Sequence, residues 1–165
     1  ALKLQNDPKE RAENIMITDL VRNDMAKTAQ KGSVNVDELC GLHSFKTVHQ
    51  LISSISSKLK EETGIDAILQ TTFPMGSMTG APKLSAMEII EKYENNKRGV
   101  YSGAIGYISP KGDFDFNVVI RSILYNSDLK RLSLQVGSAI TNQSSPQQEY
   151  EECLLKAEAL LKALK

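Results

Sequence analysis

Residues 100–141 read "VYSGAIGYISPKGDFDFNVVIRSILYNSDLKRLSLQVGSAIT". Apolar and polar residues alternate along much of this stretch, as in strands with one covered face. Two turn-forming runs, "PKGD" at 110–113 and "NSDLKR" at 126–131, divide it into three segments. The pattern predicts three antiparallel strands joined by two tight turns.

The sequence before this stretch predicts one long helix followed by strands. A helix is expected over residues 8–26, because Asp7 can cap it, Pro8 suits its first position and apolar residues recur at near-helical spacing. Residues 33–61 alternate apolar and polar residues over several stretches, which favours extended strands. A helical reading of residues 51–59 remains open.

Three further helices complete the pattern. A short helix is predicted at 66–73, and Pro82 opens a second over 82–96. Residues 145–165 form an amphipathic helix. Its predicted apolar face comprises Tyr150, Leu154, Ala157, Leu161 and Leu164. The order helix, strands, helices, strands, helix predicts an α+β fold of antiparallel sheets with flanking helices.

The composition excludes several classes of protein. The 165 residues are 41% hydrophobic, which suits one globular domain with a core. Twenty basic residues balance twenty acidic ones, so no basic excess indicates nucleic acid or a membrane surface as partner. Cys40 and Cys153 are too few for a disulfide framework, and no apolar run is long enough to cross a bilayer. A cytoplasmic location is expected.

The glycine-rich run "GSMTGAPK" at 76–83 resembles a phosphate-binding loop only superficially. Such a loop needs four residues between its glycines and a Ser or Thr after its lysine. Here three residues separate Gly76 from Gly80, and Leu84 follows Lys83. The chain also lacks GxSxG, HExxH and paired CxxC motifs, so neither a hydrolytic triad nor a zinc site is indicated.

Two pairs of glutamates lie near opposite ends of the chain. Glu10 and Glu13 are three residues apart on the first predicted helix, and Glu149 and Glu152 are three apart on the last. They are either solvated side chains on helix surfaces or, if the helices meet, a carboxylate cluster. Such a cluster would repel itself and would suit a hard divalent cation such as Mg²⁺.

Other candidate site residues each have an ordinary structural explanation as well. Arg121 interrupts the apolar run "NVVIRSIL", where a guanidinium would bind a carboxylate, form an internal ion pair or reach solvent. His49 alternates with apolar residues, and Tyr101 could offer its hydroxyl to a ligand or simply pack. Gly137 permits close backbone approach or marks the end of a strand.

Four motifs together resemble the C-terminal part of the chorismate-utilising enzymes. In chain order they are "AENIMITDLVRND", "FPMGSMTGAPKLSAMEII", "RGVYSGAIGYISPKGDFDFNVVIRS" and "SSPQQEYEECLLKAEAL". The resemblance covers nearly the whole chain. It implies that residues 1–165 are the C-terminal portion of a chorismate-binding catalytic domain, with the N-terminal portion absent.

The resemblance also implies roles for individual residues. It favours the metal interpretation of the glutamates, with Glu13 and Glu152 binding Mg²⁺ and Glu10 and Glu149 as their companions. Matching positions imply that substrate is bound by Gly80, Tyr101, Arg121, Gly137 and Lys156, with His49 assisting proton transfer. Lys83 is expected to support the glycine turn, and the signature residues Asp19, Arg22, Asn23 and Asp24 are interpreted as structural. The "GSA" at 137–139 departs from the usual "GAG" or "GGG" of the family.

The motifs also separate the branches of the family. Ser77 and Thr79 in "GSMTGAPK" are more similar to the aminodeoxychorismate synthases than to the anthranilate synthases. The implied reaction is Mg²⁺-dependent amination of chorismate to 4-amino-4-deoxychorismate in para-aminobenzoate and folate biosynthesis. The ammonia would come from a glutamine amidotransferase partner. The alternatives are the component I reaction of anthranilate synthesis and a noncatalytic fragment that carries only the metal and carboxylate half of the site.

Overall fold

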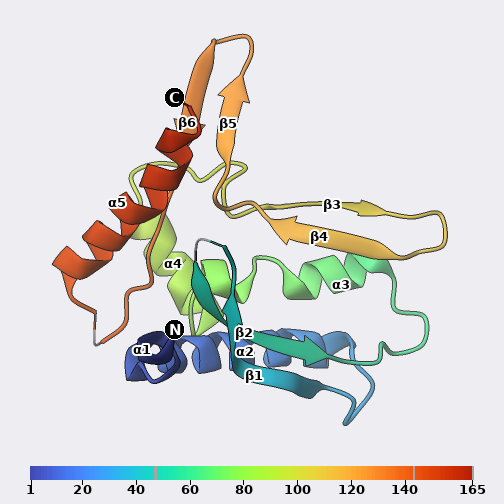
Figure 1. Ribbon diagram of the computed structural model, residues 1–165. Coiled ribbons are helices and arrows are strands. Elements are labelled where there is room, and N and C mark those ends of the chain that lie inside the picture. Colours follow the sequence, from blue (N-terminus) through green and yellow to red (C-terminus); the bar gives the residue numbers. More distant parts are fainter. Residues whose placement is uncertain (47, 143, 165) are drawn as a thin grey trace. The chain divides into compact units, whose positions relative to one another are not determined.

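The computed structural model describes residues 1–46, 48–142 and 144–164, and the chain divides into two compact units. The first unit, Ala1–Glu94, begins with two helices and a pair of strands and ends with three further helical segments (Figure 1). These elements are α1 (Leu2–Gln5), α2 (Pro8–Thr28), β1 (Asn35–Ser44), β2 (His49–Ser56), α3 (Ile65–Thr72), the 3-10 turn η1 (Gly76–Met78) and α4 (Lys83–Tyr93).

Helix α2 is the central element of the first unit. The Asp7 side chain accepts hydrogen bonds from the backbone N–H groups of Lys9 at 2.9 Å and Glu10 at 3.2 Å, which confirms the predicted cap. Pro8 follows at the first helical position, where no N–H is needed. The helix ends at Thr28, two residues beyond the predicted end. It contacts β1, β2, α3 and η1, so it organises the rest of the unit.

The strands β1 and β2 pair in antiparallel fashion and lie against α2. Strands predicted within 33–61 are thus confirmed, and the helical reading of 51–59 is wrong because β2 continues to Ser56. Asn14 of α2 joins the two layers. Its Nδ2 donates to the Leu51 carbonyl at 3.1 Å, and its Oδ1 accepts from Ser53 Oγ at 2.5 Å and from the buried Cys40 Sγ at 3.4 Å.

The two helices after the hairpin form where the sequence predicts them. Helix α3 occupies Ile65–Thr72. Helix α4 begins at Lys83, and Pro82 is its N-cap rather than its first helical residue. The peptide bonds before Pro74 and Pro82 are both cis.

The second unit, Asn95–Lys165, contains two hairpins and one helix. The first hairpin pairs β3 (Ala104–Ile108) with β4 (Phe114–Val118), and the second pairs β5 (Ile123–Asn126) with β6 (Arg131–Leu134). The prediction of three strands is therefore wrong. The expected middle strand breaks at Arg121, whose φ of 53° lies in the left-handed region that extended strands exclude.

Helix α5 (Pro146–Lys162) starts at Pro146, with Ser145 as its N-cap, and residue 165 of the predicted helix lies outside the described residues. The predicted helix is confirmed, and most of its predicted apolar face is exposed in the described residues. Tyr150, Leu154, Leu161 and Leu164 are all exposed, whereas Glu149 and Leu160 are buried. Periodicity identifies residues that share a face, but it does not identify the face that the rest of the protein covers.

The structure also describes the two cysteines and the lengths of the helices. Both cysteines are free, Cys40 buried and Cys153 partly buried, as their small number predicted. Within residues 1–46, 48–142 and 144–164, no helix combines the length and the apolar character needed to cross a bilayer.

Candidate functional site

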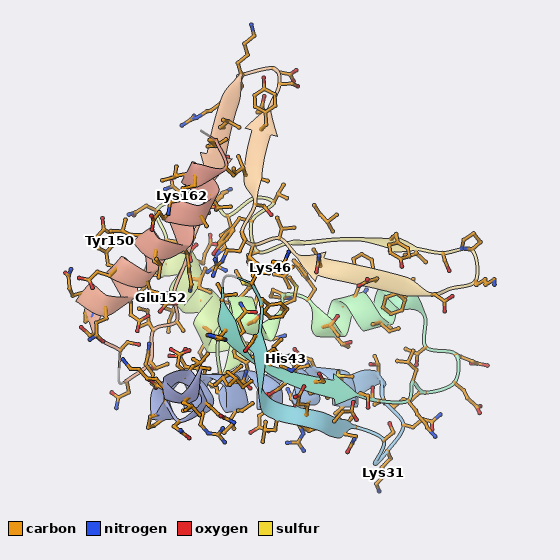
Figure 2. The ribbon with its side chains drawn as sticks, viewed as in Figure 1. Lys31, His43, Lys46, Tyr150, Glu152 and Lys162 are labelled. Atoms are coloured by element: carbon orange, nitrogen blue, oxygen red, sulfur yellow. The ribbon has the colours of Figure 1, made fainter. Side chains whose placement is uncertain are left out.

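Lys156 of α5 joins two of the predicted site residues in the second unit. Its Nζ donates to the Gly137 carbonyl at 2.8 Å and forms an ion pair with Glu152 Oε1 at 2.5 Å. Figure 2 labels Glu152 on α5. Glu152 and Lys156 are one helical turn apart, so a single ammonium group holds the loop at Gly137 against this face of the helix. The Lys156 side chain is 26% exposed.

Gly137 also lies close to Tyr101. A Cβ atom placed on Gly137 would lie 3.1 Å from the Tyr101 Oη, which is tighter than ordinary van der Waals contact. A side chain at this position would therefore require the Tyr101 ring to shift by a few tenths of an ångström. Tyr101 itself sits in a turn beside the end of β4, where Ser102 N–H donates to the Val119 carbonyl at 2.9 Å.

Ser138 is a residue that the sequence analysis missed. Its hydroxyl donates a hydrogen bond to Glu149 Oε2, and Glu149 is only 4% exposed. Hydrogen bonds from hydroxyl groups stabilise a buried carboxylate in its charged form. The signal was present in "GSA", where the middle position carries a hydroxyl instead of hydrogen or methyl. The second unit thus brings Tyr101, Gly137, Ser138, Glu149, Glu152 and Lys156 into one connected group.

The other glutamate pair lies on α2 of the first unit. The Glu13 side chain is 20% exposed, and its Oε1 lies 3.5 Å from Lys9 Nζ. Glu10 is partly buried in the first turn of the helix, where negative charge is favoured by the helix dipole. Neither side chain of this pair is fully solvated, so the chain presents partly buried carboxylates on both units.

The donor set fits a hard divalent cation. The four glutamates offer only carboxylate oxygens, which are the ligands that Mg²⁺ prefers. Each unit by itself supplies two of the four. Among the residues that the structure describes, no three His, Cys, Asp or Glu side chains form a group that could hold a metal ion. Binding of Mg²⁺ by Glu10, Glu13, Glu149 and Glu152 therefore stays a prediction.

His49 begins strand β2 and lies directly opposite Ser44 of β1. The Ser44 hydroxyl and His49 Nδ1 are 2.9 Å apart, within hydrogen-bonding distance, so Nε2 is the ring nitrogen left to act on another molecule. Because side chains alternate along a strand, His49 shares its face with Ser53, which contacts α2, while Gln50 belongs to the opposite face.

The turn that contains Gly80 is packed against α2. A side chain at Gly80 would meet the Ala86 methyl group at 3.1 Å. Lys83 donates to the Pro74 carbonyl at 2.8 Å and pairs with Asp24, which confirms that this lysine supports the turn.

Arg121 is the predicted site residue whose placement differs most from expectation. It is exposed and lies at the break between β4 and β5, not inside a strand.

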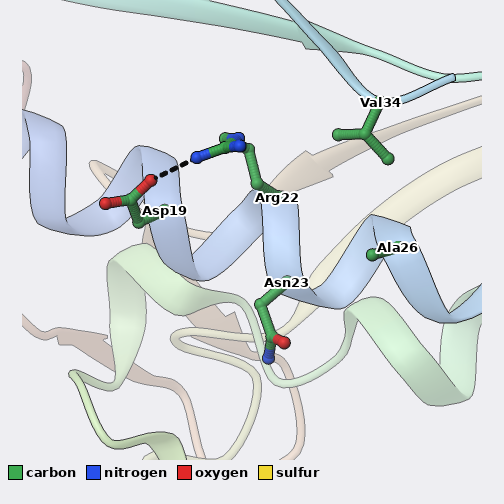
Figure 3. Close-up of a pocket in the computed structure, with 5 residues that line it drawn as sticks. All are labelled: Asp19, Arg22, Asn23, Ala26 and Val34. Atoms are coloured by element: carbon green, nitrogen blue, oxygen red, sulfur yellow. Dashed lines mark hydrogen bonds and ion pairs between the residues drawn. The ribbon is translucent and has the colours of Figure 1, made fainter. Parts of the chain in front are cut away.

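A shallow hollow of about 400 Å³ lies elsewhere on the first unit (Figure 3). It is lined by Asp19, Arg22, Asn23 and Ala26 of α2 together with Val34. Asp19 and Arg22 form an exposed ion pair at 2.7 Å across one helical turn. The lining includes three of the signature residues that were interpreted as structural and none of the predicted substrate or metal residues.

Comparison with known families identifies the family of this chain. The family of chorismate binding enzymes matches residues 1–162. The chain belongs to this family. The resemblance of the four motifs is thereby confirmed, and so is the α+β fold of antiparallel sheets with helices.

The curated relatives of this chain include proteins named aminodeoxychorismate synthase and proteins named anthranilate synthase component 1. The chain is 46% identical over 156 residues to aminodeoxychorismate synthase of Streptomyces griseus and 41% identical over 164 residues to aminodeoxychorismate synthase component 1 of Escherichia coli. It is 42% identical over 163 residues to anthranilate synthase component 1 of Aquifex aeolicus. These alignments cover 94%, 99% and 98% of the chain but only 21%, 36% and 32% of the relatives.

Solved structures agree with this family assignment. Anthranilate synthase component I of Streptococcus pneumoniae matches with a TM-score of 0.86 and 38% identity, over 95% of the chain and 36% of that protein. A putative isochorismate synthase of Bacillus anthracis matches with a TM-score of 0.87 but only 24% identity, which supports the fold alone. The chain spans about a third of the solved relatives' length or slightly more.

Proposed function

We propose that this chain forms part of an enzyme that aminates chorismate to 4-amino-4-deoxychorismate. The observation that carries the proposal is the connected group of Tyr101, Gly137, Ser138, Glu149, Glu152 and Lys156 in a chain 41% to 46% identical to proteins named aminodeoxychorismate synthase. Ammonia replaces the hydroxyl group at C4, water leaves, and the enolpyruvyl ether is retained.

The proposed roles of the residues follow from the two carboxylates of chorismate. Arg121 and the Tyr101 hydroxyl bind the carboxylate of the enolpyruvyl arm, because a guanidinium can hold a carboxylate in a bidentate manner. The backbone at Gly80 and Gly137 approaches the carboxylate of the ring. Lys156 keeps the Gly137 loop next to Glu152 through its two contacts, so that the ring lies in one orientation toward its nucleophile.

The glutamates are proposed to bind Mg²⁺. The residues proposed to hold it are Glu13 and Glu152, with Glu10 and Glu149 as partly water-mediated companions. When bound, the cation would neutralise a substrate carboxylate and make the ring hydroxyl a better leaving group. The hydrogen bond from Ser138 keeps the Glu149 carboxylate oriented. His49, with its Nδ1 bonded to Ser44, would move a proton at Nε2.

Anthranilate synthesis is the second candidate function. It is supported by the relative from Aquifex aeolicus at 42% identity and by the Streptococcus pneumoniae structure at 38%. In that reaction ammonia adds at C2 while the C4 hydroxyl leaves as water, and elimination of the enolpyruvyl arm as pyruvate then gives the aromatic product. The presence of Ser77 and Thr79 in the glycine turn favours the C4 reaction.

Release of pyruvate distinguishes the two reactions. The complete reading frame that contains this chain is incubated with chorismate, MgCl₂ and an ammonium salt, and products are separated by chromatography. We expect 4-amino-4-deoxychorismate without pyruvate, which lactate dehydrogenase and NADH would detect. Anthranilate with one equivalent of pyruvate would establish the second candidate. Absence of any chorismate consumption would refute both.

The ammonia source is tested separately. We expect the purified protein to use ammonium salts but not glutamine, and to use glutamine once a glutamine amidotransferase subunit from the same organism is added. Glutamine-dependent turnover by the purified protein alone would contradict the need for a separate partner.

A further inference from the structure

Asp24 is a buried carboxylate in a helix that otherwise presents many charged residues to solvent. It is 3% exposed, and both of its oxygens are paired. Oδ1 lies 3.1 Å from Lys27 Nζ on the same helix, and Oδ2 pairs with Lys83 Nζ. A buried charge is retained only where partners compensate its lost hydration, so the pair with Lys83 is a strong constraint on where Lys83 can lie.

Lys83 connects three parts of the first unit at one atom. Its Nζ contacts Asp24 of α2 and also donates to the Pro74 carbonyl at 2.8 Å. Lys83 is the first residue of α4, whereas Pro74 precedes the turn η1. The ammonium group therefore fastens both ends of segment 74–83 to each other and to α2. The whole "GSMTGAPK" turn, including Gly80, lies within the closed segment.

The middle of the segment is held as well. Gly76 is buried against Leu20 of α2, where an added Cβ would lie 2.8 Å from Leu20 Cδ2. The Thr79 hydroxyl donates to the Met75 carbonyl at 3.1 Å, within the segment itself. The contact at Leu20 and the pair with Asp24 lie about one helical turn apart on α2. The segment is thus attached to one side of this helix at two points.

We infer that Asp24 and Lys83 are positioning residues that fix the Gly80 turn in the geometry needed to bind a substrate carboxylate. The inference rests on the proposed function, in which the Gly80 backbone approaches a carboxylate of chorismate. It assigns a role to Asp24, whose signature "DLVRND" also contains the exposed pair Asp19 and Arg22. Two buried members of the signature, Leu20 and Asp24, contact the turn, whereas Asp19 and Arg22 are paired with each other.

The double variant Asp24→Leu/Lys83→Met in the complete reading frame separates positioning from stability. Replacing a buried ion pair by apolar residues of similar volume is often neutral for stability, whereas removing one partner is not. We expect a melting temperature within about 5 °C of the parent. The KM for chorismate should rise about tenfold or more, with kcat within about threefold, because the turn loses its tether at Pro74.

Lys27→Met is the matched control. Lys27 pairs with the same carboxylate, but its side chain is half exposed and its ion pair stays within α2. The KM of this variant should equal that of the parent.

Lys83→Arg is a second variant for the case in which the double variant does not fold. This variant keeps both charges. A planar guanidinium cannot form the ion pair with Asp24 and the hydrogen bond to the Pro74 carbonyl in the geometry that an ammonium uses, so the KM for chorismate should rise several-fold.

Hydrogen exchange provides a readout that does not depend on activity. Backbone amides of residues 75–81 should exchange at least about tenfold faster in the double variant than in the parent, while amides of α2 stay protected. Unchanged exchange in this segment, or unchanged KM in a folded variant, would overturn the inference. If the parent does not consume chorismate, the proposed function fails, and the exchange experiment still tests whether the pair holds the turn.

Discussion

The two units hold their candidate site residues by different means. In the first unit, polar groups on α2 reach into neighbouring elements: Asn14 bonds to the hairpin, and Asp24 pairs with Lys83 at the glycine turn. In the second unit, helix α5 holds a single loop, through Lys156 at Gly137 and Glu149 at Ser138. The two hairpins of that unit carry exposed apolar residues such as Ile105, at 62% exposure.

This difference predicts whether substitutions in each unit should change mainly its stability or mainly its function. The first unit combines buried polar contacts with helix and hairpin packing, so changes there should act on stability and geometry together. In the second unit, Lys156 and Glu149 of α5 bind the loop at Gly137 and Ser138 from one side of the helix. Changes on that face should therefore affect function more than folding.

The largest expected effect comes from Glu152→Gln in the complete reading frame. If Glu152 binds Mg²⁺, the loss of one charged ligand should lower Mg²⁺-dependent turnover by about 1,000-fold or more, since the metal is proposed to supply several kcal/mol. Turnover is measured against Mg²⁺ concentration, with a thermal melt to verify folding. Glu151→Gln is the control, because Glu151 is the exposed residue that precedes Glu152 on α5, and its Oε1 accepts a hydrogen bond from Gln147 at 2.8 Å. Equal turnover in both variants would remove Glu152 from the metal site.

His49→Asn tests the one predicted catalytic residue on the first unit. Loss of a proton-transfer group typically lowers kcat by about 100-fold, and KM should change little. Gln50→Ala is the control, since Gln50 lies on the opposite face of β2. A large effect of Gln50→Ala together with a small effect of His49→Asn would show that the other face of the strand meets the substrate.

Asn14→Ala should affect stability more than any loop substitution in the second unit. It removes hydrogen bonds to Leu51, Ser53 and Cys40 and leaves part-buried partners unsatisfied. We expect a loss of about 2 kcal/mol in the free energy of unfolding, measured by urea denaturation. Asn23→Ala on the same helix, which lines the shallow hollow, should cost less than about 0.5 kcal/mol. Equal losses would mean that the polar network does not stabilise the unit.

Lys156→Met should give a moderate functional loss without unfolding. The Gly137 carbonyl and Glu152 would lose their shared partner, and supporting contacts of this kind are typically worth about 10-fold or more in affinity or activity. Lys162→Met removes an i,i+4 pair with Glu158 on the same helix, at 2.7 Å, that touches no predicted site residue. An identical effect of the two variants on KM and kcat would argue that Lys156 acts only on the helix.

The smallest expected effect concerns the pH dependence of α5. The hydrogen bond and the positive charge of Lys162 lower the pKa of Glu158 below its ordinary value. A carboxyl whose pKa is lower in the folded chain adds stability above its unfolded pKa, and this contribution is lost as the pH falls through its folded pKa. In Lys162→Met, NMR titration of Glu158 should show its pKa moving up toward the ordinary value. No movement would contradict the pairing in solution.

Several features could be predicted from the sequence because they depend on local chemistry. Asp7 and Pro8 specify the start of α2 through a side-chain acceptor and a residue without an N–H. The runs "PKGD" and "NSDLKR" fall at the turns of the two hairpins in the second unit. The role of Gly137 in substrate binding stays a prediction, and in the structure the Tyr101 hydroxyl lies near it. Lys83 was expected to support its turn, and it does.

Other features depend on contacts between residues distant in sequence. The break at Arg121 was missed because "NVVIRSIL" has the composition of one continuous strand, and nothing local announces a positive φ at arginine. The exposure of the apolar side of α5 could not be predicted, because periodicity alone does not tell which face of a helix is covered.

The sequence by itself determined the family, the α+β order of elements, the helix starts and the residues with the chemistry to bind two carboxylates and a cation. The tertiary structure decided which of them meet. It joined Asp24 to Lys83 across 59 residues and Ser138 to Glu149 across 11. Caps and turns arise from groups within a few bonds of each other, whereas a buried carboxylate finds its partner only when folding excludes water from around it.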